Sequence, residues 1–180
     1  DRSSLLEQLQ NQSIKVICDN DWKGLTIERL PEIPNFTLLV GWTGQVAITD
    51  SLIQATEKKR KVETDSAFYK EFLKKSHAIV QGLQSAWNQQ DIPALQEGIR
   101  ANRALLNEFA QEMQLEIETP ALQTLCELAE QNGACAKTSG AGGGDCGICF
   151  TQNETQRQQI ETQWAKAQIQ VLPLSIAEAW

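Results

Sequence analysis

Short apolar runs separated by turn residues mark the first part of the chain. Apolar and polar positions alternate from Leu25 to Leu30, which predicts a half-buried strand ending at the prolines that follow. Phe36 to Val40 is a second apolar run. It is predicted to be a strand that leads into a loop, because the glycine-bounded sequence Gly41-Trp42-Thr43-Gly44 comes next.

From Ser51 onward the spacing of apolar residues becomes that of helices. Between Ser66 and Trp87 apolar side chains recur about every four residues and line one helical face. The same pattern returns between Leu95 and Met113. Asp91 and Pro93 suggest only a short turn between these two helices, so we expect them to pack antiparallel.

A third helix carries its own start and stop signals. Thr119 is a suitable N-cap, and Pro120 suits the first helical position, where its missing N–H costs nothing. Gly133 is expected to end this helix. Its buried stripe comprises Leu122, Leu125 and Leu128.

The rest of the chain alternates between strand and helix patterns. Strands are predicted at 134–138, 146–151 and 169–174, with a helix at 155–167. Strands interleaved with long helices predict an α+β fold, a small and mainly antiparallel sheet with helices on one face. A chain of 180 residues is expected to form one such core.

Charge and hydropathy narrow the classes of partner. Acidic residues outnumber basic ones by 23 to 16, and the basic residues are scattered apart from a run at 58–61. A nucleic-acid surface needs a clustered basic stripe, so no nucleic-acid partner is expected. No apolar run approaches the roughly 18 to 20 residues that span a bilayer, so no membrane partner is expected either.

The five cysteines stand at positions 18, 126, 135, 146 and 149. Their odd number and uneven spacing favour a reducing compartment over a disulfide framework, and we expect a cytoplasmic protein. Cys146 and Cys149 form a Cys-x-x-Cys, which leaves a redox pair or half a zinc site as distant alternatives.

A glycine-rich stretch from Lys137 to Gly147 is the most informative part of the sequence. Four glycines in five positions permit positive φ angles, so that backbone N–H groups can converge on an anion. Lys137, Thr138 and Ser139 add donors at its entrance. Asp145 would repel a phosphate unless its carboxylate turns away or faces a cation.

Other glycine-rich motifs fit this stretch less well. A nucleotide-binding P-loop ends in Gly-Lys-Ser or Gly-Lys-Thr, which is absent here. The dinucleotide fingerprint opens a helix, whereas residues of strand type follow this cluster. A plain linker would not combine near-contiguous glycines with flanking β-type segments.

Ser139-Gly140-Ala141-Gly142-Gly143-Gly144-Asp145-Cys146-Gly147 resembles the third conserved motif of the GHMP kinase superfamily. The Asp-Cys-Gly ending is similar to the phosphomevalonate kinases within it. Val40-Gly41-Trp42-Thr43-Gly44, followed by Ala47 and Thr49, resembles the loop after the strand that links the two domains of these kinases.

The resemblance implies a ferredoxin-like C-terminal domain over residues 22–180, preceded at 1–21 by a remnant of the N-terminal lobe or a linker. It further implies transfer of the γ-phosphoryl group of ATP, with Mg²⁺, onto 5-phosphomevalonate in isoprenoid precursor synthesis. The positions implied to bind substrate or phosphate are Thr49, Lys137, Ser139, Gly140, Ala141, Gly142, Gly143 and Gly144.

Two departures from the family pattern keep alternatives open. The Pro-x-x-x-Gly-Leu-x-Ser-Ser-Ala loop that cradles ATP phosphates at a helix N-terminus does not occur in this sequence, so an N-terminal lobe is an implied partner. Without it, we expect no catalytic residue and no metal ligand here, and no activity from this chain alone. Asp50-Ser51 also replaces the Ser-His expected after Thr49. A GHMP kinase with another substrate and a non-catalytic binding module remain the alternatives.

Overall fold

The computed structural model describes residues 30–46, 66–140 and 142–174. Contacts divide the chain into two compact units, Asp1–Leu30 and Pro31–Trp180. Only Leu30 of the first unit is described, so every element below belongs to the second. The strand predicted from Leu25, the helical pattern at 51–65 and the domain boundary after residue 21 lie outside the described residues.

Four strands form one antiparallel sheet in the described part of the chain. They are β1 (Thr37–Trp42), β2 (Cys135–Thr138), β3 (Cys146–Thr151) and β4 (Gln170–Leu172), in the order β2-β3-β1-β4. β1 pairs antiparallel with β3 and β4, and β2 pairs antiparallel with β3. β1 and β2 therefore run parallel on either side of β3, and β3 and β4 on either side of β1. This is the ferredoxin-like arrangement, and the predicted fold is confirmed.

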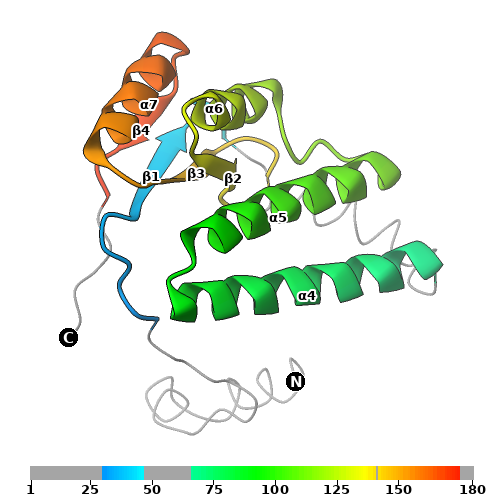
Figure 1. Ribbon diagram of the computed structural model, residues 1–180. Helices are drawn as coiled ribbons and strands as arrows, with labels where there is room; N and C mark the ends of the chain where they lie inside the picture. The colour runs from blue at the N-terminus through cyan, green and yellow to red at the C-terminus, as the bar shows by residue number, and fades with distance from the viewer. Residues whose placement is uncertain (1–29, 47–65, 141, 175–180) are drawn as a thin grey trace, which may run out of the picture. The chain divides into compact units, whose positions relative to one another are not determined.

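Helices α4 (Ala67–Gln89), α5 (Ile92–Glu112), α6 (Pro120–Gln131) and α7 (Glu154–Lys166) connect the strands (Figure 1). Each begins at a side chain that accepts a backbone N–H of the first turn. Thr119 caps α6 and Pro120 opens it, so this predicted start is confirmed. The other caps are Ser66, Asp91 and Asn153. No described helix is both long and apolar enough to cross a membrane.

The two longest helices form the predicted antiparallel hairpin. Phe72 in the first part of α4 packs on Phe109 near the end of α5, with ring centroids 4.3 Å apart. At the turn, the indole of Trp87 donates a hydrogen bond of 2.7 Å to the carbonyl of Pro31. Phe36 stacks there on Phe150 of β3, with centroids 4.9 Å apart. These contacts fasten the turn of the hairpin to the sheet.

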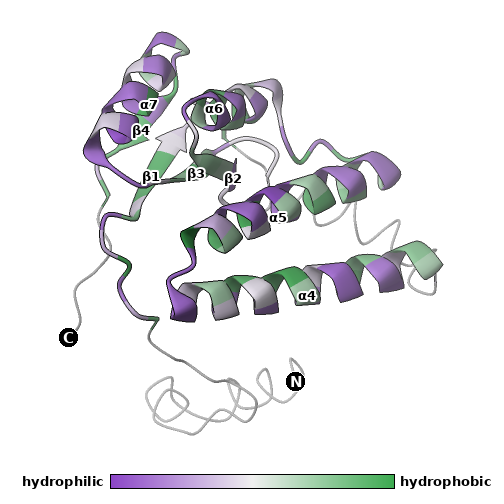
Figure 2. Cartoon of the chain, viewed as in Figure 1, coloured by the Kyte–Doolittle hydropathy of each residue, from purple (hydrophilic) through white to green (hydrophobic). Residues whose placement is uncertain are grey.

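Helices α6 and α7 cover one face of the sheet (Figure 1) and enclose the main core. Leu125 of α6 is fully buried against Ile160 and Trp164 of α7. The indole N–H of Trp164 also donates to the carbonyl of Leu125 at 3.0 Å. Because α7 is otherwise mostly hydrophilic (Figure 2), Ile160 and Trp164 are the side chains that pack it against the rest of the core.

A pair of glycines brings α6 unusually close to the sheet. Gly41 and Gly147 lie opposite each other in the β1–β3 ladder. A Cβ added to Gly147 would lie 2.6 Å from Cδ2 of Leu125, and one added to Gly41 would lie 2.8 Å from Cδ1 of the same leucine. Carbon atoms in contact are about 3.5–4.0 Å apart, so Leu125 fits only because both strands lack a side chain beneath it.

One boundary differs from the sequence-based prediction. Gly41 and Trp42 were expected in a loop, but β1 continues through both because they pair with Gly147 and Cys146 of β3. The loop begins at Thr43. β3 has the predicted bounds, and the other predicted elements within the described residues are confirmed to within a turn or less.

The glycine pair yields a stability prediction. Gly41→Ala should lower the free energy of unfolding by about 1–3 kcal/mol, because its Cβ would overpack the space between Leu125 and Trp164. Gly82→Ala is a matched control in the exposed interior of α4, where an added Cβ meets no atom within 4 Å. It should raise stability by about 0.5–1 kcal/mol through better helix propensity. Urea denaturation measures both, and equal effects of the two substitutions would contradict the close packing.

Candidate functional site

Two loops that are far apart in the sequence meet at one end of the sheet. The pairing of Trp42 with Cys146 places the residues after β1 beside those before β3. Thr43 donates from its N–H and from Oγ1 to the carbonyl of Asp145, at 2.8 and 2.9 Å. The N–H of Asp145 donates in turn to the carbonyl of Gln45 at 2.7 Å. The segments 40–44 and 139–147, both notable in the sequence, therefore form one unit.

The glycine loop depends on left-handed backbone. Gly142, Gly143, Gly144 and Asp145 have φ angles of 79°, 79°, 136° and 52°. Gly142 is also sterically required, because an added Cβ would lie 2.2 Å from the carbonyl oxygen of Ile117. Residues with a side chain rarely adopt such a run of angles, so glycine is needed for the shape of this loop.

The N–H groups of the loop alternate in what they bind. Those of Ser139, Gly143 and Asp145 donate to the backbone carbonyls of Cys146, Ile117 and Gln45, so they do not converge on a ligand as the glycine cluster suggested. Among the described residues, the N–H groups of Gly140, Gly142 and Gly144 bind no acceptor. These three donors are the candidates for binding an anion; Gly140 is exposed, whereas Gly142 and Gly144 are buried.

The residues at the loop entrance differ in exposure. Ser139 is exposed, as is Gly140. Lys137 donates from Nζ to the carbonyl of Thr138 at 2.7 Å, and burial lowers its pKa. The hydroxyl of Thr138 is buried and has no hydrogen-bond partner among the described residues. A buried orphan hydroxyl is costly, which makes it a position where a water or ligand atom would be favourable. Ala141 and Thr49, also expected at the site, lie outside the described residues.

The residues Ile117, Glu118 and Thr119, which connect α5 to α6, link the glycine loop to these two helices. The carbonyl of Ile117 accepts the N–H of Gly143 at 2.8 Å. Glu118 binds Arg103 and Asn107 of α5, and Thr119 caps α6. The side chain of Ile117 is buried in a cluster at the open end of the helix hairpin. The backbone at 117–119 therefore joins the loop to both helices.

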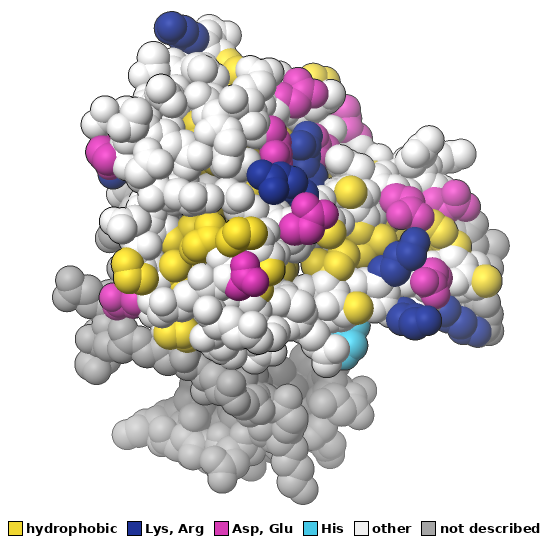
Figure 3. All heavy atoms as spheres, in the orientation of Figure 1, with side chains coloured by type: hydrophobic (Ala, Val, Ile, Leu, Met, Phe, Trp, Pro, Cys, Tyr) yellow, Lys and Arg dark blue, Asp and Glu magenta, His cyan; other side chains and the backbone are white. Residues whose placement is uncertain are grey.

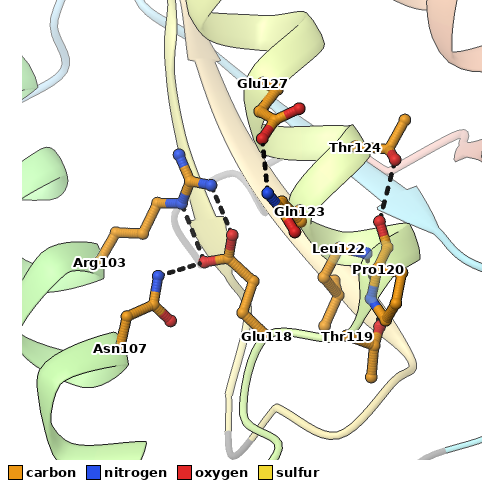
Figure 4. A network of polar contacts seen from close by, with 9 residues as sticks. All are labelled: Arg103, Asn107, Glu118, Thr119, Pro120, Leu122, Gln123, Thr124 and Glu127. Carbon is orange, nitrogen blue, oxygen red and sulfur yellow. Dashed lines mark hydrogen bonds and ion pairs between the residues drawn. The ribbon is translucent and has the colours of Figure 1, made fainter. Parts of the chain in front are cut away.

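The Glu118 carboxylate receives three hydrogen bonds (Figure 4). Arg103 donates through Nε to Oε2 at 2.9 Å and through Nη2 to Oε1, which makes a two-pronged contact. Asn107 donates to Oε2 at 2.9 Å. Burial alone would raise the pKa of Glu118, but the bonds from Arg103 and Asn107 outweigh it, so this pKa lies below its ordinary value.

Sequence reasoning missed this network. Its signal was the spacing of Arg100, Arg103 and Asn107, which places three polar residues on one face of α5. Acidic and basic side chains lie close together where α5 faces α6 (Figure 3). There Arg100 binds Glu130 at 2.8 Å and the carbonyl of Ala134 at 3.2 Å. A hollow of about 330 Å³ is lined by Arg100, Arg103, Ala104, Asn107 and Glu130.

The described cysteines favour neither a metal nor a redox site. Cys146 and Cys149 lie three residues apart on β3, so their side chains point to opposite faces of the sheet. Burial raises the pKa of Cys126 to about 12 and that of Cys135 to about 11, which keeps both as unreactive thiols. No group of three potential metal-ligating residues occurs among the described residues.

Comparison with known proteins agrees with this fold. Residues 80–170 match the family model described as GHMP kinases C terminal. The chain is 35% identical over 179 residues to a phosphomevalonate kinase from Streptomyces sp. (strain CL190), covering 98% of this chain and 47% of that protein.

Two solved structures are also similar. The Lin0012 protein of Listeria innocua gives a TM-score of 0.85 at 32% identity, covering 96% of this chain and 48% of the other. The Streptococcus pneumoniae phosphomevalonate kinase in complex with phosphomevalonate and AMPPNP gives 0.73 at 28% identity, again covering 96% and 48%. This chain thus spans about half the length of these relatives, and it belongs to the GHMP kinase C-terminal domain family.

The lowered pKa of Glu118 predicts an acid-sensitive contact. A carboxyl with a folded pKa below its unfolded value stabilises the fold above the unfolded pKa and loses that contribution as pH falls through the folded pKa. At pH values below about 4.5, the free energy of unfolding should therefore decrease more steeply with falling pH in the wild type than in Glu118→Gln, whose amide cannot titrate. Urea denaturation between about pH 6 and 3 tests this. Parallel pH profiles for the two proteins would show that Glu118 makes no such contribution.

Proposed function

We propose that this chain is the C-terminal part of a phosphomevalonate kinase. In the reaction, the γ-phosphoryl group of ATP passes to the phosphate of 5-phosphomevalonate and gives 5-diphosphomevalonate. The observation that carries the proposal is the identity of 35% to a phosphomevalonate kinase over nearly the whole chain. The glycine loop supports it, because Gly142 is sterically required and the loop keeps backbone donors unbound.

The loop would bind phosphate through the N–H groups of Gly140, Gly142 and Gly144 and the exposed hydroxyl of Ser139. Lys137 adds positive charge at the loop entrance, and Ala141 and Thr49 belong to the same proposed site. Phosphoryl transfer depends mainly on positioning and on stabilising charge at the phosphoryl oxygens, which fixed backbone donors can do. The role assigned to this chain is therefore to hold and orient the phosphorylated substrate.

Mg²⁺ accompanies ATP in the proposed reaction and is commonly held by one or two carboxylates together with the substrate phosphates. Among the described residues, no group of three or more carboxylate, imidazole or thiol side chains could hold a metal ion, and we name no Mg²⁺ ligand among them. ATP phosphates are assigned to an N-terminal lobe, which would supply the missing phosphate cradle. Residues 22–180 would then be the C-terminal domain, and 1–21 part of that lobe or a linker.

Calorimetric titration with 5-phosphomevalonate tests the substrate site. We expect binding to the wild type and about tenfold weaker binding to Ser139→Ala, the loss of one hydrogen bond to a charged group. Gly142→Ala should abolish binding because its Cβ would meet the Ile117 carbonyl, whereas Gly82→Ala, with open space around it in α4, should bind as the wild type does. Equal binding by all four proteins would place the substrate elsewhere.

A transfer assay separates binding from catalysis. This chain alone, given ATP, Mg²⁺ and 5-phosphomevalonate, should form no 5-diphosphomevalonate, because it lacks the loop that cradles ATP phosphates. A longer protein that contains the chain and the N-terminal lobe should form it. Turnover by the chain alone would contradict the assignment of ATP binding to the other lobe. Binding without turnover in the longer protein would favour a non-catalytic module.

A further inference from the structure

The position of the glycine loop is set from outside the loop. Gly143 reaches Ile117 through one hydrogen bond of 2.8 Å, and Gly142 lies against the same carbonyl closely enough to exclude a Cβ. Because both glycines lie against the Ile117 carbonyl, a displacement of that carbonyl would either move the loop with it or lengthen the hydrogen bond to Gly143. The position of the glycine loop therefore depends on the position of the backbone at residue 117.

The backbone at 117 is in turn held by the neighbouring residue. The side chain of Glu118 is 8% exposed and that of Arg103 is 20% exposed, so the ion pair is largely shielded from solvent. The planar guanidinium contacts both carboxylate oxygens, which fixes direction as well as distance. Asn107 adds a further donor from the next turn of α5. The Glu118 side chain therefore has little freedom to rotate.

We propose that Arg103 and Glu118 are positioning residues, whose ion pair holds the Ile117 carbonyl where it shapes the glycine loop for phosphate. They act through Ile117 and need not touch the ligand. The contribution to phosphate binding rests on the function proposed above, while the effect on loop position does not. Arg103 on α5 would in this way control the position of the backbone N–H groups of the glycine loop at the end of the sheet.

A neighbouring ion pair offers a matched control. Arg100 stands one turn earlier on α5 and binds Glu130 of α6 through Nε alone, at 2.8 Å. Its other contact is the carbonyl of Ala134, before β2, and not the segment 117–119. Arg100→Met and Arg103→Met therefore remove the same chemical group from the same helix, but only the second should disturb the glycine loop.

Amide hydrogen exchange at Gly143, followed by NMR, measures the loop contact directly. Arg103→Met should accelerate exchange of this amide by about tenfold, because local opening becomes easier, while Arg100→Met should leave it unchanged. Arg103→Met leaves the Glu118 charge unpaired and can unfold the protein. The double variant Arg103→Met with Glu118→Gln avoids that charge and should show the same acceleration, with amides in the β1–β3 ladder still protected.

Binding of 5-phosphomevalonate to the same variants adds the second measurement. We expect it to weaken by about tenfold in the double variant and to stay constant in Arg100→Met. Unchanged exchange at Gly143 in the double variant, or equal acceleration in Arg100→Met, would overturn the positioning role. Faster exchange with unchanged affinity would overturn its contribution to phosphate binding. If the wild type binds no 5-phosphomevalonate, the proposed function fails, and the exchange data still decide the effect on the loop.

Discussion

The close approach of Leu125 to the glycine pair in the β1–β3 ladder is the contact on which the rest of this domain depends. Without side chains at 41 and 147, α6 lies directly on the two central strands, and Leu125 is completely buried there. Trp164 then closes over it from α7. Because α6 is fixed at this distance, its N-terminus and the segment 117–119 before it are fixed as well. The packing of Leu125 thereby helps to place the segment whose Ile117 carbonyl contacts the glycine loop.

The candidate site combines two kinds of support for one loop. Thr43 and Gln45 hold the end of the loop through hydrogen bonds to the backbone of Asp145, while the Ile117 carbonyl contacts Gly142 and accepts the N–H of Gly143 in its middle. A loop fastened at several points keeps its remaining donors in place before a ligand arrives, which lowers the ordering cost of binding. Glycine therefore serves here to allow an unusual shape, while neighbouring segments supply the rigidity.

Local patterns were enough to predict most of the described fold. The strand-type run at 146–151, the Thr119-Pro120 start and the stripes of the helix hairpin each depend on residues within a few positions of one another. The contacts of the site do not. Arg103 and Glu118 are separated by a helix end and a connecting segment, and no local signal pairs them. The length of β1 also depended on its partner strand, which is why its end was predicted too early.

The bond between Thr43 and Asp145 joins residues that are 102 positions apart. Closing so long a loop has an entropic cost that must be met before its contacts form, so this junction should appear late in folding. No shorter piece of the chain can contain both halves of it. A ligand held across the junction would consequently stabilise the whole domain against unfolding, and not a single hairpin, because it binds only when both distant segments have come together.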